Sequence, residues 1–98
     1  MTQSGLSDQY VESQSADLQS RVQQATLGAA QNISSEDPST ANHAARNVLA
    51  TAVSRNPQAY TQPFCSLLCS QGIKRTSTDA EISVMVAATW NTMAGITP

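Results

Sequence analysis

Apolar residues recur at the spacing of an α-helix in four segments of the 98-residue chain, which predicts a protein built from helices. The first segment begins near residue 8 and ends before a loop-like stretch at 32–39. Its apolar stripe consists of Val11, Leu18, Val22, Ala25 and Ala29. Because this stripe is narrow and partly alanine, the helix is able to pack on its own domain or on a neighbouring protein, and the pattern leaves both arrangements open.

The second segment, at residues 41–55, carries a continuous apolar face at steps of three and four residues. Ser39 or Thr40 is expected to cap this helix, which ends near Arg55 and Asn56. Its alanines allow another helix to approach closely. The face consists of Ala41, Ala44, Ala45, Val48, Leu49, Ala52 and Val53.

Asn56 and Pro57 mark the start of a third helix, because asparagine is a common helix cap and proline suits the first helical position. Pro63 lies inside the helical pattern and is expected to bend the helix or to delay its regular start. Gly72 provides a stop signal. The apolar residues of this segment are Tyr60, Phe64, Leu67 and Leu68.

Thr78 and Glu81 match a capping box, which predicts that a fourth helix starts after a polar connector at 74–77. The apolar face that follows is the most regular in the sequence, and Gly95 closes it. This face consists of Ile82, Met85, Val86, Thr89, Trp90 and Met93.

Together these segments predict an all-α fold, a small bundle of about four helices. We expect residues 1–7 to form an extended N-terminal arm and residues 8–98 to form the helical domain. Short connections favour a compact antiparallel set of the last three helices. The predicted core consists of Val48, Leu49, Val53, Tyr60, Phe64, Leu67, Leu68, Ile82, Met85, Val86, Trp90 and Met93.

Composition narrows the classes of partner. Five basic and seven acidic residues give a net charge of −2, and Lys74-Arg75 is the longest basic run, so we expect no direct nucleic-acid binding. No stretch approaches the ~20 apolar residues of a membrane span. The first residues lack the basic and apolar regions of a secretory signal, so we expect synthesis in the cytoplasm.

The reactive side chains form no recognisable catalytic or metal-binding pattern. Cys65 and Cys69 lie four residues apart, a spacing that is poor for a disulfide within a regular helix, and we expect two small buried thiols. His43 is the only histidine, and no nucleophile motif surrounds a serine. We therefore expect no enzymatic activity, no cofactor and no metal.

Three stretches match a known class of proteins in order and spacing: ANHAARNVLA at 41–50, NPQAY at 56–60 and VAATWNTMAG at 86–95. This pattern resembles small virion structural proteins of tailed bacteriophages, of the head- or neck-associated type. The resemblance covers roughly residues 30–95. It implies a helical virion component with no catalytic or cofactor residues. The two cysteines and the alanine- and glutamine-rich first helix depart from the pattern and leave the position in the particle open.

The resemblance and the neutral surface together favour a virion protein, made in the host cytoplasm, that acts through protein–protein contacts. We expect a capsid cement or decoration protein or a head–tail neck protein; a tail or baseplate position is the remaining choice. Its partners are then capsid, portal or tail subunits in a symmetric assembly. The candidate partner-binding residues are Leu6, Tyr10, Val11 and Leu18.

Two alternatives belong to other functional classes. One is a small regulatory protein that binds a host protein and inhibits or modulates it. The other is an accessory subunit of an enzyme, in which the stripe around Trp90 docks as a helix into a groove.

Overall fold

The computed structural model describes residues 10–97, in which the regular elements are helices joined by loops and no strand occurs, and this confirms the predicted all-α class. The helical residues 10–14 come first. The main helices are α2 (Ala16–Ser34), α3 (His43–Arg55), α4 (Pro57–Ser70) and α5 (Asp79–Met93). None of the helices within 10–97 is both long and apolar enough to cross a bilayer. The predicted arm at 1–7 lies outside the described residues.

Ser15 divides the predicted first helix in two. Its hydroxyl accepts a hydrogen bond from the Leu18 N–H at 3.2 Å and thereby caps α2. The buried side of α2 also differs from the predicted stripe, because Ala25 and Ala29 are only half-buried. The buried residues of α2 are Leu18, Val22, Thr26, Ala30 and Ile33.

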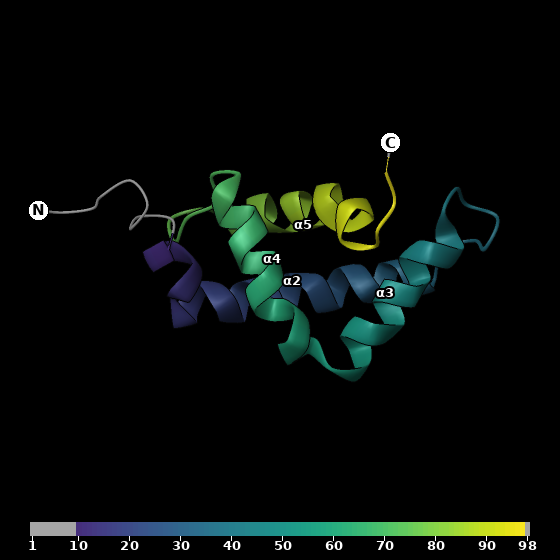
Figure 1. Ribbon diagram of the computed structural model, residues 1–98, viewed down its shortest axis with the longest axis horizontal. Coiled ribbons are helices and arrows are strands. Elements are labelled where there is room, and N and C mark those ends of the chain that lie inside the picture. The colour runs from purple at the N-terminus through teal and green to yellow at the C-terminus, as the bar shows by residue number, and fades with distance from the viewer. Residues whose placement is uncertain (1–9, 98) are drawn as a thin grey trace, which may run out of the picture.

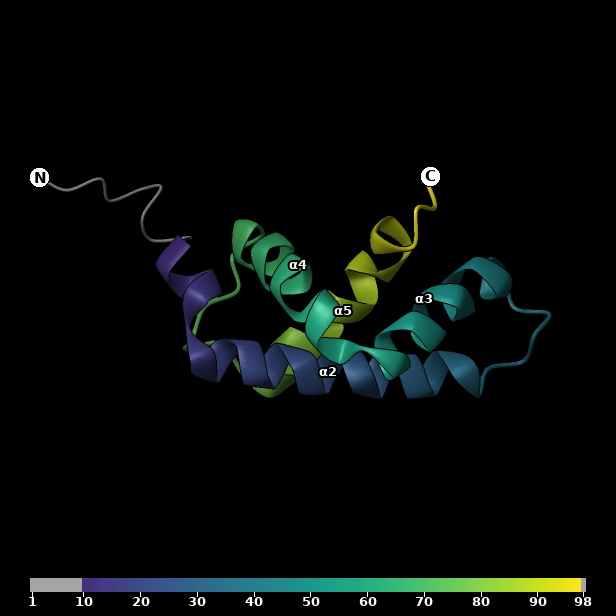
Figure 2. The same ribbon diagram turned by 60° about the horizontal axis from the view of Figure 1, so that its bottom comes forward.

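The centre of the fold is α2. Helices α3, α4 and α5 each pack mainly on α2 and less on one another, and Figure 2 shows α2 as the long rod to which the other three are attached. The prediction that the last three helices pack chiefly on one another as a compact set is therefore wrong. Short connections keep consecutive helices near each other, but the apolar side of α2 is the surface that all three helices bury.

Local signals at the C-terminal end of α4 and at both ends of α5 are confirmed, whereas the Asn56 side chain makes no capping hydrogen bond at the start of α4. The Thr78 hydroxyl accepts a hydrogen bond from the Glu81 N–H at 3.1 Å, and the Glu81 carboxylate accepts one from the Thr78 N–H at 2.7 Å. Gly72 and Gly95 adopt positive φ angles of 107° and 80°. This conformation lets the N–H group after each glycine bond to a carbonyl five residues earlier, which ends both helices.

The start of α3 differs from the prediction. Asn42, with a left-handed φ of 60°, occupies the cap position, and its side chain makes no capping hydrogen bond. Ser39 instead donates its N–H and its hydroxyl to the Asp37 carboxylate, each at 2.9 Å. These hydrogen bonds lower the pKa of Asp37. Ser39 therefore shapes the loop before α3 rather than capping the helix.

Helix α4 begins at Pro57, as predicted, and continues through Pro63 to Ser70. Pro63 therefore does not delay the start of the helix. Its position on the exposed side lets water satisfy the backbone carbonyl that a proline leaves without an N–H partner.

The core is built around Phe64 and Trp90, whose ring centroids are 5.6 Å apart. The Trp90 indole N–H donates to the Arg46 carbonyl at 3.1 Å and so links α5 to α3. Among the predicted core residues, the buried ones are Leu49, Val53, Phe64, Leu68, Ile82, Val86 and Trp90. The partly buried ones are Tyr60, Leu67, Met85 and Met93.

Val48 is a clear error in the predicted core, because 71% of this residue is exposed. Helix α3 turns Leu49, Ala50 and Val53 toward the core. At 3.6 residues per turn, this orientation places Val48 on the far side of the helix. The periodic pattern identified an apolar face that is wider than the part that α2 covers.

Candidate protein-binding surface

The α4–α5 loop, residues 71–78, and the helical residues 10–14 form one end of the molecule (Figure 1). The Glu12 carboxylate accepts hydrogen bonds from the Arg75 backbone N–H at 2.8 Å and from its guanidinium at 3.2 Å. The backbone bond, and then the side-chain bonds, lower the pKa of Glu12. One carboxylate thus joins two segments that are 63 residues apart in sequence.

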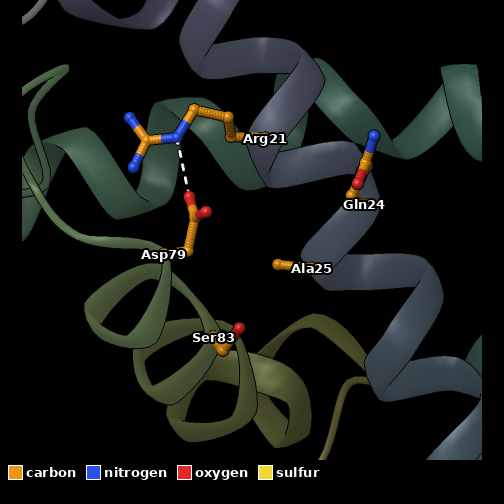
Figure 3. Close-up of a pocket in the computed structure, with 5 residues that line it drawn as sticks. All are labelled: Arg21, Gln24, Ala25, Asp79 and Ser83. Atoms are coloured by element: carbon orange, nitrogen blue, oxygen red, sulfur yellow. Dashed lines mark hydrogen bonds and ion pairs between the residues drawn. The ribbon is translucent and has the colours of Figure 1, made fainter.

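Arg21 of α2 also binds the α4–α5 loop, through its guanidinium group. Its Nε donates to the Asp79 carboxylate at 2.8 Å. Figure 3 marks this hydrogen bond with a dashed line. Its Nη2 and Nη1 donate to the backbone carbonyls of Ser77 at 2.6 Å and Arg75 at 3.0 Å. A hollow of about 260 Å³ lies beside this group. Because the guanidinium already donates to three acceptors, we assign Arg21 to loop stabilisation rather than to binding an anion.

The four residues predicted to bind a partner differ in how exposed they are in the structure. Tyr10 and Val11 are 64% and 49% exposed, so they are accessible to a partner. Leu18 is completely buried, so its predicted role is wrong. The reason is that α2 lies at the centre of the fold, where the other helices cover its apolar stripe. Leu6 lies outside the described residues.

A first exposed apolar surface lies on α5 and the loop before it. Val84 is 69% exposed and borders a hollow of about 440 Å³. We call this surface the Val84 patch; it consists of Ile73, Ala80, Glu81, Val84 and Met85. The periodic apolar pattern of α5 did not predict this surface. The sequence nevertheless contains a signal for it, because no charged residue follows Glu81. A helical segment without charge on any side, as α5 is after its first turn, is typically covered on more than one side.

A second exposed apolar surface lies on α3, where Val48 borders a hollow of about 370 Å³. We call it the Val48 patch; it consists of Asn47, Val48, Thr51, Ala52 and Arg55. Hydrogen bonds from Ser34 to Asn47 and from Arg46 to Glu36 fix α3 against the C-terminal end of α2. The Val48 patch therefore lies at the opposite end of α2 from the α4–α5 loop.

His43 lies at the start of α3, next to an acidic residue. Its Nδ1 is 3.6 Å from the Glu36 carboxylate, which is too long for a hydrogen bond and leaves this buried nitrogen without a partner within residues 10–97. The same carboxylate accepts a hydrogen bond from Arg46 at 2.9 Å. Within the described chain, no serine or cysteine side chain is hydrogen-bonded to this nitrogen.

Cys65 and Cys69 are both buried and carry free thiols, in agreement with the prediction of two small buried side chains. Burial, and then the neighbouring Cys69, raise the pKa of Cys65 to about 12. Burial, and then the charge of Glu12, raise the pKa of Cys69. Both thiols are therefore protonated at neutral pH and weak as nucleophiles. Across 10–97, no three or more His, Cys, Asp or Glu side chains gather in a metal-binding group.

Trp90 is fully buried, so it cannot dock into a partner's groove as the enzyme-accessory alternative requires. Among residues 10–97, the large apolar side chains that are exposed are those of Tyr10, Val11, Val48 and Val84. Comparison with known proteins finds no matching family model, curated protein or solved structure.

Proposed function

We propose that this protein is a structural component of a tailed-phage virion that acts through protein–protein contacts. The observation that carries the proposal is the exposure of Val48 and Val84, each beside a hollow, on a domain whose core is otherwise well covered. We assign these two surfaces to protein binding because each combines an exposed apolar side chain with a hollow that a partner's side chain can fill. The resemblance of residues 41–50, 56–60 and 86–95 to virion proteins supports the phage assignment.

We place the protein on the capsid surface, as a cement or decoration protein, or at the head–tail neck, in contact with capsid, portal or tail subunits. Its few charges and its small apolar patches favour contacts that are individually weak. A symmetric particle repeats each contact many times, and the repetition multiplies the total affinity. This setting suits a small domain of this kind.

Mass spectrometry of purified particles of the encoding phage tests the proposal. We expect the protein at a constant copy number relative to the major capsid protein, with the same ratio after a second purification by density. Lysate from infected cells is the control. Detection in lysate but not in particles would refute the structural role and favour the regulatory alternative, a protein that inhibits or modulates a host protein.

A further inference from the structure

We propose that copies of this protein associate head to tail, with the Val84 patch of one copy packed against the Val48 patch of the next. The inference rests on the proposed protein-binding function, because it names one of the partners. The partner that binds each of the two patches is another copy of this chain. Two observations support the inference, the placement and the charges of the patches, and the size of the patches limits how strong the contact is.

The placement of the two patches favours a head-to-tail contact. The Val84 patch includes residues of the α4–α5 loop, which Arg21 holds at the N-terminal end of α2. The Val48 patch lies near the C-terminal end of α2, where Asn47 is bonded to Ser34. A helix of 19 residues is about 28 Å long, so the patches of one molecule cannot cover each other. Two different surfaces at opposite ends are the arrangement from which rings and filaments form.

The charges of the two patches are complementary. Glu81 is the charged residue of the Val84 patch, and Arg55 is the charged residue of the Val48 patch. Arg55 forms no ion pair within residues 10–97. A head-to-tail contact brings the two opposite charges together. A symmetric contact of either patch with itself would instead place like charges near each other, which disfavours it.

The size of the patches limits the strength of the contact. One face of α3 or α5 is about 20 Å long and about 10 Å wide, or on the order of 200 Å². A stable interface needs about 800 Å² from each partner. A single contact is therefore weak, whereas a closed ring or a lattice site uses both patches of every copy and stabilises the assembly.

Sedimentation velocity of the full-length protein over about 10 µM to 1 mM tests the inference. We expect the average mass to rise with concentration. Val84→Glu and Val48→Glu should each remain monomeric, because each variant places a charge in one patch. Since both positions are exposed, both variants should keep the helical circular dichroism and the melting temperature of the wild type.

An equimolar mixture of the two variants provides the decisive measurement. Each variant retains one intact patch, and the two intact patches are complementary, so we expect the mixture to form dimers and nothing larger. A wild-type protein that stays monomeric at 1 mM would overturn the inference. Association that is lost in only one of the two variants would also overturn it, because that result indicates a symmetric contact. A mixture of the two variants that forms no dimer would overturn it as well.

Two further variants test the proposed ion pair between Glu81 of one copy and Arg55 of the next. Glu81→Gln removes the charge but preserves the capping box, since glutamine also caps at this position. Arg55→Gln removes the opposite charge. We expect each variant to weaken association by about two- to fivefold, and the double variant to lose less than the product of the two effects. Fully independent effects would contradict the pairing. These measurements of self-association are independent of the mass spectrometry of phage particles. The protein can be absent from particles and still self-associate, so the two proposals can be refuted separately.

Discussion

The region around Trp90 and the end around the α4–α5 loop are held together by different forces. Trp90 packs against Phe64 in a buried cluster to which all four main helices contribute. The loop end contains a single buried apolar residue between 71 and 78, Ile73. There, Arg21 and Glu12 supply charge-assisted hydrogen bonds to backbone groups of the loop.

The comparison shows why a small protein with four aromatic residues can still order a polar loop. Burial of apolar area is strong but non-directional, and it needs large side chains. Hydrogen bonds from charged groups are directional and satisfy backbone carbonyls that no helix or strand pairs. The core should therefore respond most to loss of volume, and the loop end to loss of charge.

The largest effect is expected for Trp90→Ala. The variant removes the biggest buried side chain and its hydrogen bond to Arg46, so we expect a loss of about 3–5 kcal/mol in the free energy of unfolding. Urea unfolding followed by circular dichroism measures it. Trp90→Phe should lose less, because it retains an aromatic contact with Phe64. A loss below about 1 kcal/mol for the alanine variant would contradict a core centred on Trp90.

A smaller and more local effect is expected for Arg21→Ala. It removes hydrogen bonds to Asp79, Ser77 and Arg75, which predicts a loss of about 1–3 kcal/mol. Amide hydrogen exchange should become faster in residues 75–79 and remain unchanged around Trp90. Arg55→Ala is the matched control, with an expected change within about 0.5 kcal/mol. Unchanged exchange in the loop would show that Arg21 does not hold it.

The smallest effect is expected from acid titration of Glu12. Its pKa in the folded protein is below the ordinary value of 4.5, because Arg75 donates hydrogen bonds to the ionised form. The stabilising contribution is therefore present above pH 4.5 and is lost as the pH falls through the lower, folded pKa. We expect residues 10–14 to separate from the loop before the core unfolds.

Nuclear magnetic resonance measures this step, because the Arg75 amide shift should follow the protonation of Glu12. Glu12→Gln is the control and should remove the pH dependence of that amide at acidic pH. A Glu12 that titrates at 4.5 or above would contradict the hydrogen bonds described here.

The candidate surface was only partly predictable from the sequence. Tyr10 and Val11, two of the residues that the sequence proposed for partner binding, are exposed in the structure. Val84 was missed because it lies off the most regular apolar stripe of α5, and Leu18 and Val48 were assigned to the wrong environments. Helical periodicity reports which residues share a face, but the neighbouring helices decide how much of that face is covered.

The sequence by itself determined the helices and most of their ends. The capping box at Thr78, the glycines at 72 and 95 and the proline at 57 act through groups a few residues apart, so no distant partner is needed. The tertiary structure alone decided that α2 is central, that Val48 faces outward, and that Glu12 and Arg21 meet a loop more than 50 residues away. Such contacts depend on how whole helices pack, and this packing is a collective property of the chain.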